Sequence, residues 1–521
     1  MSVITKEINK SKLIISLSGA IAFYLFAHGF RFSNMLFSGD ALFQLCQNDY
    51  AWQIALGRFM HPFLVFVRGS LTSPWLIGWL SAIWIGLSVY LISDYLKIEK
   101  PLFIILCAAI MTGNPVFISL NSAFLQVSDF YALALLLSVA AVWFTDKWFA
   151  DKRKWYLLVP AIFSIVFSLG IYQAYLCVTV GLVMIKAIKA LSEDDSVVET
   201  SIKVAVYGGI TILSCGLYFI IWKTFQKALN IWTADSYNGL SDIDEVIGTG
   251  FFSSVASAYK NVIDFIVNPE VFYSLTFRSV NMSILWIIIF RISNALIIFA
   301  TIYLVLINNI KKKATLRCLL QVALMALLPL GINIVCIISQ GMQHTLMIYG
   351  MLLIYIFSIS EFSAISTNHG VAKPTKWIPS FLCIVPIVLL IWNNCVYANQ
   401  VYLKKALQQE ATTSLLSRMI NDIENMEGYV LGETPVALSG NLRSCKSIPT
   451  LENFETIQVY GMGDSLLTYG GSENFYINYI LNVDMNLVSI AATDEVKKMP
   501  CYPDFGSIKY IDDIIVVKIS D

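Results

Sequence analysis

The sequence predicts an all-α polytopic membrane protein of about eleven transmembrane helices with a small α/β domain at its C-terminal end. Of the 521 residues, 57% are hydrophobic and only 13% are charged, roughly half the charged fraction of soluble domains. The apolar residues collect in segments of roughly 17–25 residues, long enough to cross a hydrocarbon layer of about 30 Å. This composition excludes a soluble enzyme and a disordered chain. The 35 acidic and 35 basic residues cancel, so no nucleic-acid partner is expected.

Hydropathy along the chain indicates the eleven spans. The first follows several lysines and resembles a signal peptide, but no small-residue cleavage site follows it, so we expect a retained helix. The third is short and is expected to dip or tilt. The expected spans are 13–30, 74–92, 101–111, 129–145, 155–170, 172–191, 204–225, 283–307, 319–338, 345–360 and 378–396.

Lysine and arginine are distributed unevenly over the connecting loops. The loops after the second, fourth, sixth, eighth and tenth spans all contain them, whereas the short loops 111–128 and 339–344 contain none. Because cytoplasmic loops are enriched in these residues, we expect the N-terminus on the cytoplasmic side. An odd number of spans then places the C-terminal segment on the outer side.

Three regions on the expected outer side are too long to be simple turns. They are 31–73 between the first two spans, 226–282 before the eighth span, and 399–521 after the last. We therefore divide the chain into a transmembrane module, 1–398, and a soluble outer domain, 399–521.

The outer domain has the composition of a soluble protein and is large enough to fold separately. A helix is expected over 401–426, followed by short strands with glycine-rich turns and the β-rich run 508–519. In an oxidising compartment its Cys445 and Cys501 could form a disulfide, or both could be free thiols.

The first outer loop contains most of the residues capable of chemistry. Polar residues recur at four-residue intervals with apolar residues between them, which predicts a helix lying in the membrane interface with its polar side toward water. Asp40, just beyond the first span, is either a helix N-cap or a catalytic carboxylate. Arg58 and His61 could equally be interfacial anchors, and Arg68 is interpreted as one. The candidate site residues of the loop are Asp40, Asp49, Trp52, Gln53, Arg58 and His61.

Further candidates lie in the other outer loops. Asp129 begins the fourth span and is either an N-cap or a residue facing the outer cavity. Tyr172 and Gln173 form the turn between the fifth and sixth spans, which suits hydrogen bonding to hydroxyls or an aromatic belt. Arg278 and His344, at the outer ends of the eighth and tenth spans, are candidate phosphate ligands.

Motifs for nucleotide phosphates, for metals and for a nucleophilic serine do not occur in the sequence, so it indicates no cofactor and no metal site. Arg291, within the eighth span, must face protein or water because an intramembrane charge is costly. An enzyme whose polar groups face outward has no access to cytoplasmic nucleotide sugars. Its activated donor must therefore arrive through the lipid, which indicates a polyprenyl phosphate.

The acidic first outer loop, the Trp52…Gly57-Arg58 element and the soluble tail ending in 500–518 resemble the GtrII-type glucosyltransferases. These are membrane enzymes of the GT-C class that modify bacterial O-antigen, the outer polysaccharide of lipopolysaccharide. Family members often carry a paired Asp-Asp where this chain has Gly39-Asp40, so only the second acid is present here.

The resemblance implies a GT-C-like fold in a bacterial inner membrane, with the N-terminus cytoplasmic and the C-terminal domain periplasmic. It implies glucosyl undecaprenyl phosphate as donor, made by a separate synthase and flipped outward by a separate flippase. The acceptor would be a sugar hydroxyl of a surface polysaccharide such as O-antigen.

The resemblance also implies roles for individual residues. Asp40 would be the general base that removes the acceptor proton during an inverting displacement. Donor phosphate would be bound by Arg58, Arg278 and His344. The acceptor or sugar would be bound by Asp49, Trp52, Gln53, His61, Asp129, Tyr172 and Gln173.

Other functions stay open at this point. An O-antigen polymerase or ligase would concentrate Arg and His in its large outer loop, whereas 226–282 holds few basic residues besides Arg278. A secondary transporter or flippase would show internal repeats and ionisable residues along a midplane path. A scaffold without catalysis would be indifferent to Asp40→Asn.

Overall fold

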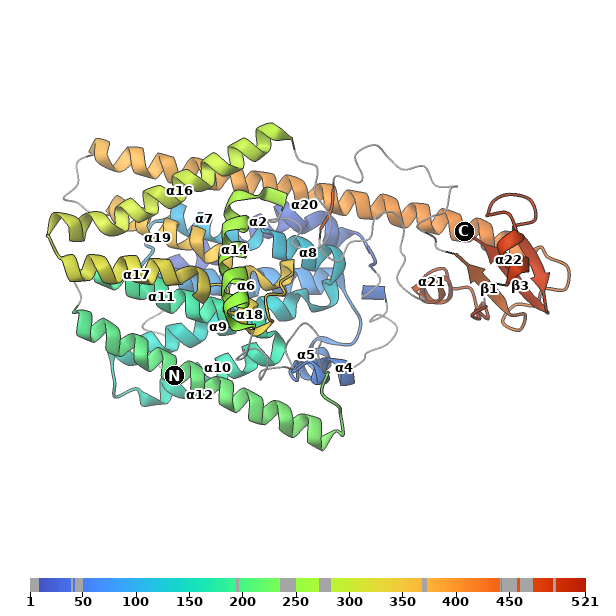
Figure 1. The fold of residues 1–521 in the computed structure, drawn as a ribbon, viewed down its shortest axis with the longest axis horizontal. Coiled ribbons are helices and arrows are strands. Elements are labelled where there is room, and N and C mark those ends of the chain that lie inside the picture. Colours follow the sequence, from blue (N-terminus) through green and yellow to red (C-terminus); the bar gives the residue numbers. More distant parts are fainter. Residues whose placement is uncertain are drawn as a thin grey trace.

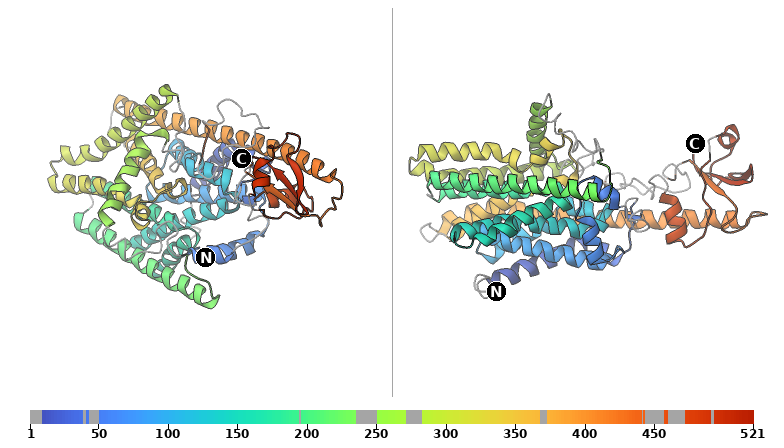
Figure 2. Two further views of the ribbon diagram at one scale, coloured as in Figure 1. Left: turned by 45° about the vertical axis from the view of Figure 1, so that its right-hand side comes forward. Right: turned by 90° about the horizontal axis from the view of Figure 1, so that it is seen from below.

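The computed structural model describes most of the chain as a long body of helices that ends in a small sheet (Figure 1). The right-hand view in Figure 2 shows most body helices running roughly along one direction, with the sheet beyond one end. The described residues are 9–38, 41–42, 50–193, 196–234, 250–270, 283–367, 373–440, 442, 457–459, 472–490 and 493–521.

The described helices vary widely in length, from single turns to one of 52 residues. Their bounds are α2 Lys10–Ser33, α4 Tyr50–Ala55, α5 His61–Arg68, α6 Pro74–Tyr95, α7 Pro101–Thr112, α8 Pro115–Ala123, α9 Ser128–Ala150, α10 Leu158–Ile171, α11 Leu176–Ser192, α12 Val197–Ala228, α14 Phe251–Val267, α16 Ile284–Lys311, α17 Thr315–Gly331, α18 Ile334–Ile338, α19 Leu353–Thr367, α20 Lys373–Glu424, α21 Ser472–Phe475 and α22 Asp494–Lys498.

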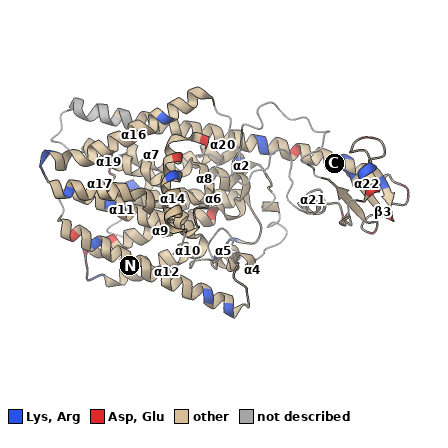
Figure 3. Ribbon diagram, in the orientation of Figure 1, with Lys and Arg blue, Asp and Glu red and all other residues tan. Residues whose placement is uncertain are grey.

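Among the described residues, eight helices are long and apolar enough to cross a membrane, or up to nine if the bent pair α7–α8 is one span. The predicted count of about eleven is therefore not confirmed. The predicted spans 155–170 and 319–338 correspond to two shorter apolar helices, α10 and α17. Charged residues lie mostly toward the ends of the body helices and on the sheet domain, which suits a membrane protein (Figure 3).

The third predicted span, 101–111, corresponds to α7, and a second helix, α8, follows it where an outer loop was expected. Helices α7 and α8 meet at an angle of 43°. Gly113 follows α7, and the Asn114 side chain accepts a hydrogen bond from the Phe117 amide at 3.2 Å, which caps α8. Pro115 then occupies the first position of α8, where its missing N–H leaves no donor unsatisfied.

The region 226–282 is more helical than its mixed polarity predicts. Helix α12 continues to Ala228, and α14 packs against α16, α17 and α18. Arg291 of α16 donates to the Val267 carbonyl at 3.0 Å and to Asn268 Oδ1 at 3.3 Å. It thus contacts protein, as its position in an apolar segment requires, and lies at the C-terminal end of α14, where a helix favours a cation.

The last predicted span and the predicted tail helix form one continuous helix, α20, which extends beyond the body to the C-terminal domain (Figure 1). The sheet has the order β1-β3-β2, with β1 Val436–Ser439 parallel to β3 Ile514–Lys518 and β2 Ile508–Ile511 antiparallel to it. This confirms the β-rich run 508–519. Apolar residues of α20 pack with β1 and β3 in one buried cluster, so the helix anchors the sheet.

Candidate functional site

The candidate site lies at the end of the helical body that faces the C-terminal domain, called the domain end below (Figures 1 and 2). The chain that leaves α2 is held there from two sides. Arg31 Nε donates to the Asn121 carbonyl at 2.7 Å, and the Gln409 amide of α20 donates to the Met35 carbonyl at 2.8 Å. Phe37 packs into the buried cluster of the C-terminal domain.

Three of the predicted site residues, Asp40, Asp49 and Arg278, lie outside the described residues, as does Cys445. Their roles stay predictions. Ser38, two positions before Asp40 in the sequence, donates a hydrogen bond to the Ala123 carbonyl at the end of α8.

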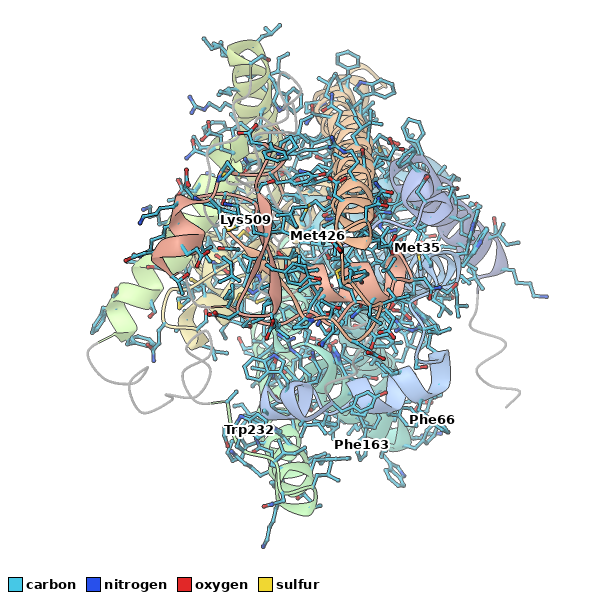
Figure 4. All side chains as sticks on the ribbon, turned by 90° about the vertical axis from the view of Figure 1, so that its right-hand side faces the viewer. Met35, Phe66, Phe163, Trp232, Met426 and Lys509 are labelled. Atoms are coloured by element: carbon cyan, nitrogen blue, oxygen red, sulfur yellow. The ribbon has the colours of Figure 1, made fainter. Side chains whose placement is uncertain are left out.

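The predicted single interfacial helix is wrong: two short helices, α4 and α5, are separated by a turn at Gly57. Gly57 has a φ of +84°, which glycine adopts readily and which ends α4. A Cβ at this position would lie 2.2 Å from the Tyr218 hydroxyl. The apolar side of α5 does face outward, because Phe66 is 85% exposed and lies at the periphery in Figure 4.

Arg58 lies in this turn and forms the first cluster of the site. Its Nη1 donates to Gln53 Oε1 at 3.3 Å, and its guanidinium carbon lies 5.0 Å from the centroid of the Tyr172 ring, a cation–π distance. The Tyr172 hydroxyl is 3.5 Å from Nε2 of His344. The fold therefore brings Arg58 and His344, two of the three predicted phosphate ligands, to the same tyrosine, Arg58 against its ring and His344 near its hydroxyl.

His344 differs from a simple cationic ligand. Burial and the neighbouring charge of Arg58 lower the pKa of His344 to about 3, so its imidazole is neutral at physiological pH. It can offer one N–H donor, whereas Arg58 supplies the positive charge.

Gln173 supports the turn. Its Nε2 donates to the Leu56 carbonyl at 2.7 Å and to the Tyr218 hydroxyl at 2.9 Å. Tyr218 in turn donates to the Gly57 carbonyl at 3.2 Å. Gln173 therefore positions the backbone next to Arg58. Trp52, on the preceding helix α4, is half-buried.

Arg68 forms a buried ion pair with Asp129, which corrects its interpretation as a lipid anchor. The two side chains are 6% and 3% exposed, and Nη1 lies 2.7 Å from Oδ1. The same Nη1 donates to the Gln126 carbonyl at 2.8 Å, and the guanidinium carbon lies 4.3 Å from the Phe130 ring centroid. The pair joins the end of α5 to the first turn of α9, and each charge is buried only because the other neutralises it.

A pocket of about 390 Å³, including the space at its open mouth, lies between α4, α5 and the start of α9. His61 lies on its wall, where its Nε2 donates to the Ile171 carbonyl at 3.1 Å. Burial and the charge of Arg58 lower the pKa of His61 to about 3, so its Nδ1 is a bare acceptor. The pocket is lined by Tyr50, Gln53, His61, Val65, Arg68, Ser70, Thr72, Gln126, Val127 and Phe130.

Comparison with known families decides what kind of protein carries this site. The family model described as glucosyl transferase GtrII matches residues 29–355, a range that contains Arg58, His344 and the whole pocket. The chain belongs to the GtrII glucosyl transferase family. No curated protein and no solved structure matches it. As a GtrII-family glycosyltransferase of the membrane, it needs a sugar donor and an acceptor.

The GtrII-family chain has a second cationic group that the sequence analysis missed. Lys405 of α20 is 4% exposed, and the charges of Arg31 and of buried Lys404 act on it. Within the described part of the chain, Lys405 has no hydrogen bond or ion pair. A buried amine beside two cations favours its neutral form unless an anion lies nearby. Two lysines in a predicted soluble helix give no sign of this burial.

The described part of this glycosyltransferase contains no group of three or more His, Cys, Asp or Glu side chains that could hold a metal ion. Gln126 is the other functional candidate that the sequence analysis did not select. It lies in a largely apolar connection before α9, and only its place in the pocket distinguishes it.

Proposed function

We propose that this glycosyltransferase transfers glucose from undecaprenyl phosphate to a sugar hydroxyl of a surface polysaccharide such as O-antigen. Membership of the GtrII family supports glucosyl transfer. The observation that carries the rest is the position of Arg58, a cation at one end of an apolar helical body, beside a polar pocket whose charged wall residue, Arg68, is paired with Asp129. A phosphate on a lipid tail and a neutral sugar are the two chemistries that such neighbours accommodate.

The proposed reaction is an inverting displacement at the anomeric carbon. Asp40 takes the proton of the acceptor hydroxyl, and the acceptor oxygen forms the new bond to the anomeric carbon. The bond from that carbon to the phosphate oxygen breaks, and its electron pair remains on undecaprenyl phosphate. The leaving group is already anionic, so it needs positive charge more than a proton donor.

In this proposal Arg58 and Arg278 supply that charge, and neutral His344 supplies a hydrogen bond. The buried group around Lys405 adds a further cationic position close to the chain that leads from α2 toward Asp40. Asp49, Trp52, Gln53, His61 and Tyr172 bind sugar, whereas Asp129 and Gln173 position the groups next to them.

The proposed topology follows the distribution of basic loops. The protein lies in a bacterial inner membrane with its N-terminus in the cytoplasm, about eleven spans, and the domain end in the periplasm. A separate synthase makes the donor and a separate flippase delivers it. α10 and α17 are then short spans within the bundle.

The test uses purified protein in lipid nanodiscs, synthetic prenyl-phosphate glucose and isolated O-polysaccharide, with mass spectrometry of the glycan. We expect Asp40→Asn to lower the transfer rate by about 10²-fold or more, and Arg58→Ala to raise the KM for the donor. Arg418→Ala, at an exposed position on α20 outside the site, is the matched control and should leave both unchanged. Undiminished transfer by Asp40→Asn would remove this residue from the mechanism, and chain growth by whole repeat units would favour a polymerase.

A further inference from the structure

The turn that carries His344 is held to the protein by a side-chain amide. Gln340 and Gly341 have φ values of +53° and +86°, which reverse the chain after α18. The Gly341 amide donates to the Cys336 carbonyl at 2.8 Å, which ties the start of the turn to α18. Gln343 comes immediately before His344, and its side chain is buried. The position of His344 therefore depends on what holds Gln343.

Gln343 and Asn333 form a reciprocal pair of side-chain amides. Asn333 Nδ2 donates to Gln343 Oε1 at 3.2 Å, and Gln343 Nε2 donates to Asn333 Oδ1. Asn333 is fully buried at the joint between α17 and α18. Its Nδ2 also donates to the Ala258 carbonyl of α14 at 3.2 Å. Because a carbonyl only accepts, this contact fixes which way the Asn333 amide faces, and the Gln343 amide has to match it.

Asn261 of α14 joins Asn333 and Gln343, and the three residues are called the amide cluster below. Its Nδ2 donates to Gln343 Oε1 at 2.7 Å and to Cys336 Sγ at 3.4 Å. Gln343 thus uses both acceptor positions of its oxygen and one of its two N–H groups. A shift of the turn would leave buried amides without partners, which costs free energy. The amide cluster therefore gives the turn one preferred position relative to α14.

The contact between His344 and Tyr172 is sensitive to this position. Nε2 of His344 lies 3.5 Å from the Tyr172 hydroxyl, which is near the upper limit for a hydrogen bond. The Tyr172 ring is held separately, because it stacks on Tyr131 with ring centroids 4.4 Å apart and planes at 18°. Arg58 lies 5.0 Å from the same ring. Even a small shift of the turn therefore moves His344 away from Tyr172 and changes its place relative to Arg58.

We propose that Gln343 is a positioning residue, which through its amide pair with Asn333 holds His344 where it binds the donor phosphate together with Arg58. The inference rests on the proposed function, because that function assigns the phosphate to Arg58 and His344. Gln343 itself touches no substrate. Its effect on glucosyl transfer passes through His344, and this dependence can be measured.

The first test measures the position of His344 without any transfer reaction. Diethyl pyrocarbonate modifies accessible neutral imidazoles, and peptide mass spectrometry of the full-length protein in nanodiscs reports the modified fraction of His344. We expect Gln343→Met, which keeps the side-chain length and removes the amide, to raise the modification rate of His344 severalfold. Gln400→Met, the same change at an exposed position on α20, is the matched control and should react as the wild type does. An unchanged rate in folded Gln343→Met would overturn the positioning role.

Asn261→Leu is a second variant at a half-buried position, so it keeps the test decisive if Gln343→Met fails to fold. It removes one hydrogen bond to Gln343 and leaves the reciprocal pair with Asn333. It should therefore raise the modification rate of His344 by a smaller factor. A wild-type rate in folded Asn261→Leu would also overturn the proposal.

Steady-state transfer tests whether this position matters for the donor. Gln343→Met should raise the KM for prenyl-phosphate glucose by roughly 2- to 12-fold, the factor that one net hydrogen bond represents. The KM for O-polysaccharide should stay unchanged. In a His344→Phe background the same substitution should have no further effect, because it acts through His344. Additive effects of the two substitutions would indicate a general structural role and overturn the proposal.

The positioning role and the proposed function fail in different ways. Faster modification of His344 in Gln343→Met, without glucosyl transfer by the wild type, would refute the proposed function and retain the hold of Gln343 on His344. Transfer by the wild type, with an unchanged donor KM in a Gln343→Met protein whose His344 reacts faster, would overturn the positioning role and retain the function.

Discussion

The buried ion pair between Arg68 and Asp129 makes the sharpest prediction about stability. Each side chain is nearly inaccessible, and the charges are 2.7 Å apart. Arg68→Met leaves the carboxylate buried without its cation, and Asp129→Leu leaves the guanidinium buried without its anion. Breaking a buried pair from one side destabilises a protein by about 3–5 kcal/mol, because an uncompensated charge stays in a poorly hydrated place.

The double variant has a different expected value. Replacing both charges with apolar groups of similar size is often nearly neutral. Here it also removes the hydrogen bond from Arg68 to the Gln126 carbonyl at 2.8 Å, which contributes roughly 0.5–1.5 kcal/mol. The double variant should thus be about 1 kcal/mol less stable than the wild type, and the two single effects should be strongly non-additive.

The assay is reversible unfolding in detergent, followed by tryptophan fluorescence, over the complete double-mutant cycle. The control is Lys203→Met, which breaks an exposed pair with Glu199 at 2.8 Å; it should change stability by less than about 1 kcal/mol. The reasoning is refuted if the single variants lose no more stability than this control, or if their effects simply add.

Three further predictions concern the turn, the histidines and the topology. Gly57→Ala places a Cβ 2.2 Å from the Tyr218 hydroxyl at a residue with a positive φ. The turn that holds Arg58 should therefore shift, and kcat/KM for the donor should fall. Gly29→Ala is the control, because its Cβ would meet open space, and it should leave kcat/KM unchanged. The pKa values of His61 and His344 are about 3 in the folded protein and near 6.5 in the unfolded chain. Their contribution to stability is therefore complete above about pH 6.5 and is lost toward pH 3, by about 1.4 kcal/mol per pH unit for each. Replacing both histidines with glutamine should make the free energy of unfolding less dependent on pH in this window. An unchanged slope of this free energy against pH would contradict the burial of the two side chains. Alkaline phosphatase fused after the last residue should be active if the C-terminal domain is periplasmic, and inactivity would reverse the proposed topology.

Local sequence pattern was sufficient for the apolar body and for the β-rich run 508–519. A segment such as 74–92 must be apolar along its whole length to lie in lipid, so hydropathy identifies it without knowledge of its neighbours. The run 508–519 carries strand-forming residues on both sides of Asp512 and Asp513, which adopt the positive φ values of a tight hairpin turn. The GtrII resemblance was confirmed by a family match over 29–355.

In the first outer loop, the local pattern did not predict the structure. Four-residue spacing predicted one interfacial helix, because spacing records which residues share a face and not whether the chain remains helical between them. The contacts of Gln173 and Tyr218 with the backbone hold the turn at Gly57 and separate α4 from α5.

Composition and hydropathy predicted the membrane body, since both are properties that each segment has by itself. The resemblance of the first outer loop and the tail predicted the family. Only the tertiary structure paired Arg68 with Asp129, made His344 neutral, buried Lys405 among cations and placed Gln126 in a pocket. The charge state and accessibility of a side chain depend on groups that arrive from distant parts of the chain, and no local pattern records which groups those are.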